Sequence, residues 1–326
     1  MISNLLVFLS IVHIVHGNAT NSSQQTTPDF HVCSLQSFRK FCENDTTIII
    51  DKSLTMIKGY PLHVVYNRVP KSASEMLRKL FREQAESRHF TIENEEIFVP
   101  FRLSPEVHRE IASDILNAKA PVLYERHMYF VDFNALKYPQ PVYINMIRDP
   151  VKRIISQYYW TRQACREENR CYLDMKYLNE SLDECVQRRS ALECINPAQG
   201  VDTILPFFCG HDPKCESLSN YSLNEAKKNI INHYTVVGVV EELYNFLFLL
   251  ERLLPRFFRN ISLKYMSDDQ IRIESSTRTT GKRPEPSNST KAALRKALAL
   301  EYDLYDFVKT RFQNQFQQVL LTMTNV

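Results

Sequence analysis

Glycine is scarce in this sequence, with 6 residues in 326, and no glycine-rich phosphate loop is present. An ATP-type loop reads Gly-x-x-x-x-Gly-Lys-Ser/Thr, and its absence argues against a nucleotide kinase. An excess of charge is also lacking, because 40 basic residues face 37 acidic ones and leave a formal net charge of +3. The composition therefore implies no nucleic-acid partner, and any polyanionic partner must be met by a local basic patch.

The Cys-x-x-Cys spacing typical of structural zinc is absent as well, so we expect no metal site. The 8 cysteines instead stand in close sequential pairs. An even count at short spacings indicates local disulfides formed in an oxidising compartment, although spacing alone does not fix the connectivity. The expected pairs are Cys33–Cys42, Cys165–Cys171, Cys185–Cys194 and Cys209–Cys215.

The N-terminus carries an apolar run at residues 2–15 that requires a targeting explanation. The run is shorter than the roughly 20 apolar residues of a membrane-spanning helix, and no Lys or Arg precedes it. We therefore expect residues 1–17 to be either a cleaved signal peptide or a short signal anchor. The first alternative predicts a soluble lumenal or secreted protein, and the second predicts a membrane-anchored one.

A high density of N-glycosylation sequons also indicates passage through the secretory pathway. The sequons stand at Asn18, Asn21, Asn44, Asn179, Asn220, Asn260 and Asn288. Residues 18–55 are rich in Asn, Ser, Thr and Gln, so we expect a glycosylated stem there. The folded domain is expected at 56–315, followed by a C-terminal tail at 316–326.

Apolar strand-like runs alternate with helical segments through the folded part. Strands are expected at 62–69, 122–126, 142–148 and 235–240, and helices at 73–88, 105–116, 150–162, 223–233, 242–253 and 291–312. This alternation predicts an α/β fold in which a parallel sheet carries helices on both faces. Residues 163–219 show little periodicity and contain most of the cysteines, so we expect an irregular, disulfide-stapled insertion.

The segment at 66–74 (YNRVPKSAS) leads a buried strand through a polar loop into a helix. Backbone N–H groups at a helix start are unpaired and carry a partial positive charge, so they can hold a phosphate. Lys71 and the hydroxyls of Ser72 and Ser74 would complete such a cradle. The alternative is a capped helix start with a solvated Lys71.

A second strand-to-helix junction at 143–156 (YINMIRDPVKRIIS) repeats this arrangement, with Arg148 at the end of the strand. Ser156 lies two helical turns beyond Arg148. A binding role for both residues requires a second phosphate, which a bisphosphate nucleotide has. The alternative is a surface ion pair between Arg148 and Asp149, which would contribute little.

These two segments resemble the 5′-phosphosulfate loop and the 3′-phosphate motif of the sulfotransferase superfamily, and more narrowly those of the uronyl 2-O-sulfotransferases. Further similar stretches lie at 122–133, 205–215, 236–254 and 301–312. The resemblance implies a sulfotransferase-type, P-loop-like sheet and 3′-phosphoadenosine 5′-phosphosulfate as donor. It also implies sulfation at the 2-hydroxyl of a hexuronic acid in a glycosaminoglycan, with heparan sulfate and its iduronic acid as first choice. Dermatan or chondroitin sulfate is an alternative acceptor, and an inactive glycosaminoglycan-binding homologue is an alternative class.

The position matching the family's catalytic base is His127. An imidazole with a pKa of about 6.5 can take the proton of a sugar hydroxyl, and a structural histidine is the alternative. Lys71 would stabilise the departing phosphate. The donor-binding residues that the resemblance implies are Arg68, Lys71, Ser72, Ala73, Ser74, Arg148, Ser156, Arg278, Thr279, Thr280 and Lys282.

Acceptor binding needs cations that can face a carboxylate and sulfates. The candidates are Arg68, Lys79, Arg126, Arg162 and Arg166, each with a solvated surface charge as the alternative. Two acidic residues depart from the family pattern. Glu75 stands where relatives usually carry Thr or Ser, and Glu125 stands where the heparan sulfate enzymes carry a second histidine. The resemblance further implies a Golgi lumenal protein, type II membrane anchoring and a homo-oligomer, namely a trimer.

Overall fold

The computed structural model describes residues 57–94, 102–167, 171, 173–268 and 283–324. The expected N-terminal targeting segment and the stem lie outside this range. So do the pair Cys33–Cys42 and the sequons at Asn18, Asn21 and Asn44. None of the helices within the described residues has the length and apolar character needed to cross a membrane.

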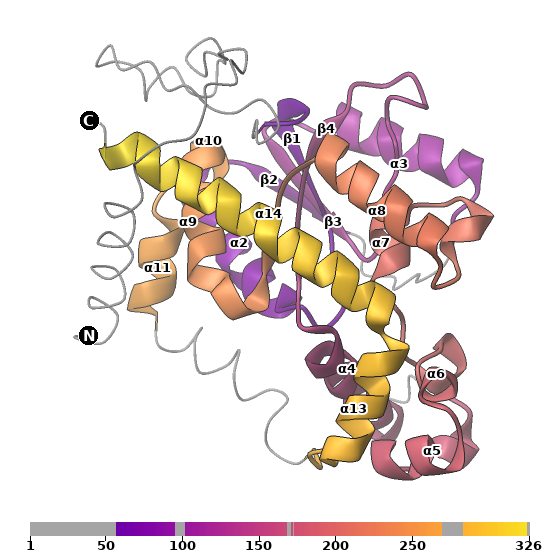
Figure 1. Ribbon diagram of the computed structural model, residues 1–326. Coiled ribbons are helices and arrows are strands. Elements are labelled where there is room, and N and C mark those ends of the chain that lie inside the picture. Colours follow the sequence, from indigo (N-terminus) through magenta and orange to yellow (C-terminus); the bar gives the residue numbers. More distant parts are fainter. Residues whose placement is uncertain (1–56, 95–101, 168–170, 172, 269–282, 325–326) are drawn as a thin grey trace, which may run out of the picture.

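A five-stranded sheet lies at the centre of the molecule (Figure 1). Its strands are β1 (Tyr60–Asn67), β2 (Thr91–Asn94), β3 (Val122–Arg126), β4 (Pro141–Ile147) and β5 (Tyr234–Val239). They pair in the order β2-β3-β1-β4-β5, and every pairing is parallel. Every residue of β4 is buried, as expected for an inner strand covered on both faces. The predicted α/β class is confirmed.

Helices cover both faces of the sheet (Figure 1). On one side lie α2 (Ser74–Arg88), α9 (Leu243–Leu253), α10 (Pro255–Phe258) and α11 (Ile261–Ser267). On the other side lie α3 (Pro105–Asn117), α7 (Leu205–Cys209) and α8 (Asn220–His233). Aromatic side chains join the layers to the sheet; the ring centroids of Tyr66 on β1 and Phe81 on α2, for example, are 5.7 Å apart.

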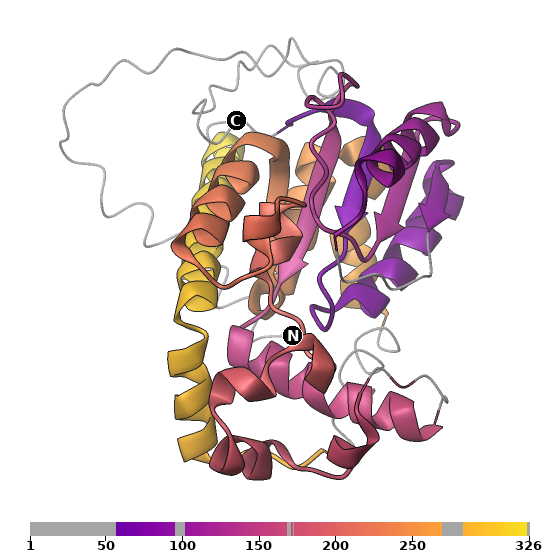
Figure 2. The same cartoon turned by 90° about the vertical axis from the view of Figure 1, so that its right-hand side faces the viewer.

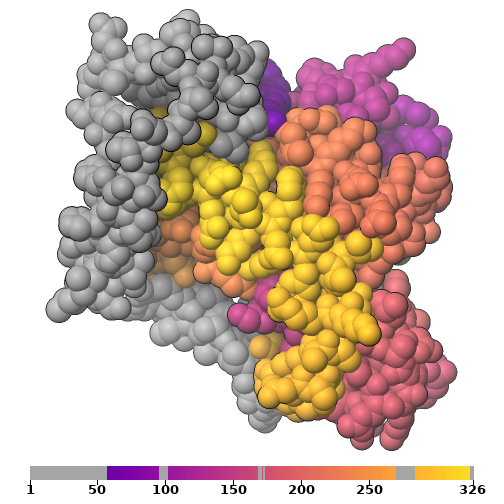
Figure 3. All heavy atoms as spheres, viewed as in Figure 1, coloured from indigo at the N-terminus to yellow at the C-terminus, as the bar shows by residue number. Residues whose placement is uncertain are grey.

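The C-terminal part forms two helices, α13 (Asn288–Ala297) and α14 (Ala299–Thr324). Figure 3 shows α14 crossing one face of the molecule. It packs along the edge strand β5, where Arg311 and Gln315 donate hydrogen bonds to the carbonyls of Tyr234 (3.1 Å) and Thr235 (2.9 Å). The segment expected as a C-terminal tail from residue 316 continues this helix, because Phe316 and Val319 are buried in the hydrophobic core.

A second, smaller hydrophobic cluster lies below the sheet, at the end where the strands terminate (Figure 2). It joins α13 to α4 (Pro150–Glu167), α5 (Leu182–Arg188) and α6 (Ala191–Cys194), and it includes Tyr158, Leu182 and Leu294. Disulfides join Cys165 to Cys171, Cys185 to Cys194 and Cys209 to Cys215. Single 3₁₀ turns occur at Met175–Tyr177, Pro197–Gln199, Pro213–Cys215 and Val240–Glu242.

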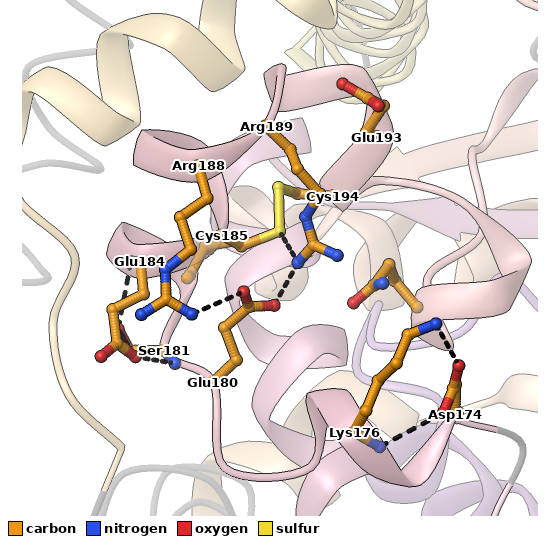
Figure 4. Close-up of polar contacts among 12 residues, drawn as sticks. Asp174, Lys176, Glu180, Ser181, Glu184, Cys185, Arg188, Arg189, Glu193 and Cys194 are labelled. Atoms are coloured by element: carbon orange, nitrogen blue, oxygen red, sulfur yellow. Dashed lines mark hydrogen bonds and ion pairs between the residues drawn. A yellow bond between two sulfur atoms is a disulfide. The ribbon is translucent and has the colours of Figure 1, made fainter.

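The insertion contains more regular structure than its sequence predicts. Ser181 begins α5 and Ser190 begins α6, and each forms a capping box with a glutamate three residues later. Figure 4 shows Arg189 between these helices, where it contacts Glu180 and the sulfur of Cys185. Short capped helices and a disulfide therefore hold this segment.

Candidate active site

The loop between β1 and α2 brings Lys71 to the start of a helix. Lys71 and Ala73 adopt left-handed φ angles of 62° and 60°. Non-glycine residues rarely adopt this conformation, so the loop stores strain of the kind found at functional sites. Ala73 is the N-cap of α2 and no side chain caps this helix, which leaves its N-terminus available to an anion.

Asp149 shapes the second junction by capping α4. Its Oδ1 accepts a hydrogen bond from the backbone N–H of Lys152 at 2.9 Å, and its Oδ2 accepts one from the Tyr302 hydroxyl at 3.1 Å. Its own N–H donates to Glu241 Oε1 at 3.2 Å. Asp149 therefore fixes the start of α4 rather than serving as a surface ion-pair partner.

Arg148 connects the two junctions directly. Its Nη1 donates to the carbonyl of Lys71 at 3.5 Å, so the two predicted phosphate loops lie side by side. Burial lowers the pKa of Arg148, and the like charge of Arg283 lowers it further, while Glu241 and Asp149 oppose both effects. The adjacent guanidinium groups of Arg148 and Arg283 can together bind an anionic group here.

Two hydroxyls near these cations are buried. Ser72 is 0% exposed and Ser156 is 2% exposed. Within the described residues, neither Oγ atom has a hydrogen-bond partner. Buried polar groups are nearly always paired, so these two atoms mark places where a ligand can supply the missing bond. One hydroxyl lies on each of the two junctions where the sequence predicts a phosphate.

His127 follows the last residue of β3 and is partly buried. Its Nδ1 lies 2.9 Å from the carbonyl oxygen of Arg68, and a carbonyl can only accept, so Nδ1 carries the proton. Nε2 of the neutral ring then keeps its lone pair. Burial lowers the pKa of His127 to about 3, and the positive charge of Arg68 contributes in the same direction. The ring is therefore neutral near pH 7, as a proton acceptor must be.

The side chains of Arg68 and Lys71 line this region from the β1–α2 loop. The Nε and Nη1 atoms of Arg68 are buried and have no hydrogen-bond partner among the described residues. Burial lowers the pKa of Arg68, with Glu125 opposing. The Nζ atom of Lys71 lies 4.9 Å from the ring centroid of Trp160, a cation–π distance, and Trp160 is 43% exposed.

Arg162 corrects one of the acceptor assignments. Its guanidinium donates to the carbonyls of Glu180 and Tyr158 and to Gln199 Oε1, each at 3.1–3.2 Å, and it lies over the Tyr158 ring. The residue is 1% exposed, and burial lowers its pKa to about 10. All three nitrogens are occupied by protein partners, so Arg162 holds the insertion onto α4 and is not available to an acceptor.

The other acceptor candidates differ in their surroundings. Arg166 is exposed at the end of α4 and donates to the carbonyl of Leu178 at 2.8 Å. Arg126 and Lys79 are partly buried beside the loops. The predicted donor residues Arg278, Thr279, Thr280 and Lys282 lie outside the described residues, as does the loop that contains them. The sequon asparagines at 179, 220, 260 and 288 are all exposed.

Arg283 also lies in the candidate site, although the sequence did not predict it there. It is partly buried beside Arg148, and its Nη1 has no hydrogen-bond partner within the described part of the chain. Its position next to Lys282, in the same basic run, was the feature of the sequence that could have indicated a role for Arg283. Across the described residues, no group of His, Cys, Asp or Glu side chains could hold a metal ion.

Comparison with known proteins identifies the family. Residues 55–308 match the sulfotransferase family. Human uronyl 2-sulfotransferase is 33% identical over 267 residues, which cover 78% of this chain but only 63% of the human protein. The Drosophila melanogaster heparin sulfate O-sulfotransferase is 32% identical, with 77% of this chain and 72% of that protein covered. Heparan sulfate 2-O-sulfotransferase 1 of Xenopus laevis is also 32% identical, with 77% and 70% covered. The profile match and these relatives together show that the chain belongs to the sulfotransferase family.

Proposed function

We propose that the protein transfers a sulfo group from 3′-phosphoadenosine 5′-phosphosulfate to the 2-hydroxyl of a hexuronic acid in a glycosaminoglycan. Heparan sulfate and its iduronic acid are the preferred acceptor. The observation that carries this proposal is the hydrogen bond from Arg148 to the carbonyl of Lys71, which joins two anion-binding loops next to His127. The names of the relatives, which refer to uronyl and heparan sulfate 2-sulfation, support the choice of acceptor.

The described residues fit a doubly phosphorylated donor. Lys71 and the uncapped start of α2 would hold the 5′-phosphosulfate, while Arg148, Arg283 and Ser156 would hold the 3′-phosphate. Phosphate oxygens would also satisfy the buried hydroxyls of Ser72 and Ser156. When bound, the donor supplies the sulfonyl group and a phosphate leaving group.

In the proposed reaction His127 removes the proton of the acceptor 2-hydroxyl through Nε2. The carbonyl of Arg68 orients the ring by accepting the Nδ1 proton. Lys71 and the α2 N-terminus stabilise the negative charge that develops on the leaving phosphate. These groups act mainly by position and charge, because sulfo transfer resembles phosphoryl transfer in this respect.

The donor is also expected to strengthen the base. The pKa of His127 is about 3, because the ring is partly buried and faces the cations Arg68, Arg78 and Lys71. An anion bound by these cations offsets their field and therefore raises the pKa of His127. Proton removal thus becomes more favourable only when the donor is in place.

Other acceptors and another class of function are kept as alternatives. Dermatan and chondroitin sulfate carry the same target hydroxyl in a different disaccharide. An inactive homologue that only binds glycosaminoglycans would keep the basic surface, but it would have no reason to keep Lys71, Arg148 and His127 together. We further propose a secretory-pathway location, namely the Golgi lumen with a type II anchor. The exposed sequons support this location.

The function is tested by incubating the purified protein with labelled donor and with heparan, dermatan and chondroitin acceptors separately. After digestion to disaccharides, we expect label on the uronic acid 2-position of heparan sulfate. His127→Ala should abolish transfer, while the exposed control His89→Gln should keep it. Binding of 3′-phosphoadenosine 5′-phosphate is followed separately by the emission of Trp160, the single tryptophan of the chain. Absence of label from every uronic acid 2-position would refute the assignment.

A further inference from the structure

Glu75 lies between two guanidinium groups at the first turn of α2. Its Oε1 is 4.0 Å from Nη1 of Arg68 and 3.5 Å from Nη1 of Arg78. The side chain is nevertheless 57% exposed. The carboxylate therefore contributes a negative charge to the surface immediately beside Arg68.

A buried contact fixes this carboxylate in place. Nε of Arg78 donates to Oε1 of Glu125 at 2.7 Å, and the Glu125 side chain is 1% exposed. A charge-assisted hydrogen bond to a buried carboxylate is short and strong, so Arg78 is firmly held. Glu75 is therefore placed by an anchored partner and not by a mobile surface cation.

The same network reaches the proposed base. The guanidinium of Arg68 faces Glu75, and the carbonyl of Arg68 accepts the hydrogen bond from His127 Nδ1 at 2.9 Å. The Nε and Nη1 atoms of Arg68 are buried without hydrogen-bond partners among the described residues. An acceptor that is held by the Arg68 guanidinium while its hydroxyl faces His127 would therefore lie near the charge of Glu75.

The charges of this cluster are balanced as the structure stands. Arg68 and Arg78 carry two positive charges, and Glu75 and Glu125 carry two negative ones. Arg68, Arg78 and Glu125 are 3%, 12% and 1% exposed, whereas Glu75 is 57% exposed, so the Glu75 carboxylate is the charge of this cluster that reaches the surface. Two like charges about 4 Å apart in water repel by an energy that changes an equilibrium constant about five-fold.

We propose that Glu75 is a specificity-determining residue that selects acceptors with few sulfate groups around the target uronic acid. A sulfate next to that uronic acid would lie against the Glu75 carboxylate, whereas a neutral N-acetyl or hydroxyl group would not. This inference rests on the proposed function, since it takes the acceptor to be a glycosaminoglycan. Relatives with Thr or Ser at this position would lack the repulsion.

The test replaces the charge and keeps the shape. Glu75→Gln is compared with the unaltered protein in binding two heparan-type oligosaccharides of equal length, one N-acetylated and one N- and 6-O-sulfated, with 3′-phosphoadenosine 5′-phosphate present. Calorimetry measures affinity, and labelled donor measures kcat/KM. We expect Glu75→Gln to gain about five-fold in affinity and kcat/KM for the sulfated oligosaccharide, and much less for the N-acetylated one. Added salt should shrink the difference.

Glu83→Gln is the matched control. Glu83 lies on the same helix and also pairs with a cation, Lys264 at 2.8 Å, but it is two turns beyond Glu75. This variant should leave the preference unchanged. An equal effect of Glu75→Gln on both oligosaccharides, or no effect, overturns the inference. A protein that binds the oligosaccharides without transferring label removes the proposed function, yet its binding data still decide the role of Glu75. Failure to bind either oligosaccharide overturns both.

Discussion

His127 shows how a single side chain is prepared by its surroundings. The Arg68 carbonyl selects the tautomer in which Nδ1 carries the proton and Nε2 the lone pair. Burial and neighbouring cations keep the ring neutral by lowering its pKa to about 3. Such a ring is ready to accept a proton but is a weak base. In the proposed reaction the anionic donor would raise this pKa, so binding of one substrate would activate the base for the other.

The pH dependence of the rate follows from this shift. The base works when neutral, so activity is lost as pH falls through the pKa of His127. For the free protein, kcat/KM for the donor should fall only well below pH 6.5, as the pH approaches the His127 pKa of about 3. With saturating donor, kcat/KM for the acceptor should lose activity at a higher pH, because the donor raises the pKa. Initial rates are measured over the pH range in which circular dichroism shows an intact fold. If both values of kcat/KM fall at the same acidic pH, the prediction is contradicted.

At the scale of elements, α14 covers the edge of the sheet formed by β5. The carbonyls of Tyr234 and Thr235 on the edge strand β5 accept hydrogen bonds from Arg311 and Gln315 of this helix. Phe316 then adds an aromatic contact with Phe248 of α9, with ring centroids 5.7 Å apart. The helix thereby protects an edge that could otherwise pair with another chain.

Truncation of one buried side chain on α14 should show how much this packing contributes to the free energy of unfolding. Phe316 is 6% exposed, so Phe316→Ala removes a buried ring and should lower the free energy of unfolding by about 3 kcal/mol. Met323→Ala on the same helix is the control, because that side chain is 43% exposed and its loss should change stability by less than about 0.5 kcal/mol. Urea unfolding compares the two variants, and equal losses would show that the C-terminal turns do not belong to the core.

The elements that could be predicted from the sequence are those with strong apolar patterns. The strands at Val122–Arg126 and Pro141–Ile147 read clearly because nearly every side chain is buried. β2 was missed, since Thr91–Asn94 is a short polar strand at the sheet edge with no buried residue. The helices α5 and α6 are too short for a periodic signal. Their Ser-x-x-Glu capping boxes at Ser181 and Ser190 were nevertheless visible in the sequence.

The site was predictable at its strand ends and less so elsewhere. Lys71, Arg148 and His127 each follow a strand of one parallel sheet, so topology brings them to the same edge. The burial of Arg162 could not be predicted, because its partners Glu180 and Gln199 come from the insertion, whose path has no pattern in the sequence. The ion pair between Glu75 and Arg78 also depends on side-chain conformations that the spacing of the two residues in the sequence does not determine.

At the scale of the whole molecule, two partly buried histidines make the stability depend on pH. The rings of His108 and His211 contact each other at an interplanar angle of 48°, with centroids 4.1 Å apart, and Leu103 N–H donates to His211 Nδ1 at 3.1 Å. Burial, and then the charge that His108 would carry, lower the pKa of His211 to about 3. Burial lowers the pKa of His108 as well. These rings resist protonation only while the chain is folded.

The fold should therefore lose stability in acid. Between the unfolded pKa of about 6.5 and the folded pKa of about 3, the unfolded chain binds more protons, so the free energy of unfolding falls as pH drops through this window. His211→Asn keeps an acceptor for Leu103 and should reduce the loss between pH 7 and pH 5 in urea unfolding. His89→Gln, at an exposed position, should not. An unchanged acid loss in His211→Asn would exclude this pair as its source.

The division of the apolar interior into two clusters has a consequence for the reaction cycle. The β1–α2 loop belongs to the large cluster, whereas α4 contributes Val151, Ile154 and Tyr158 to the small one. A nucleotide that contacts both Lys71 and Ser156 would bridge the parts of the protein that are built on these two clusters. Its binding free energy would then stabilise the contact between these two units. Release of the product nucleotide would then remove this contribution to the contact between the two units. Product release and relative motion of the two units would therefore be coupled.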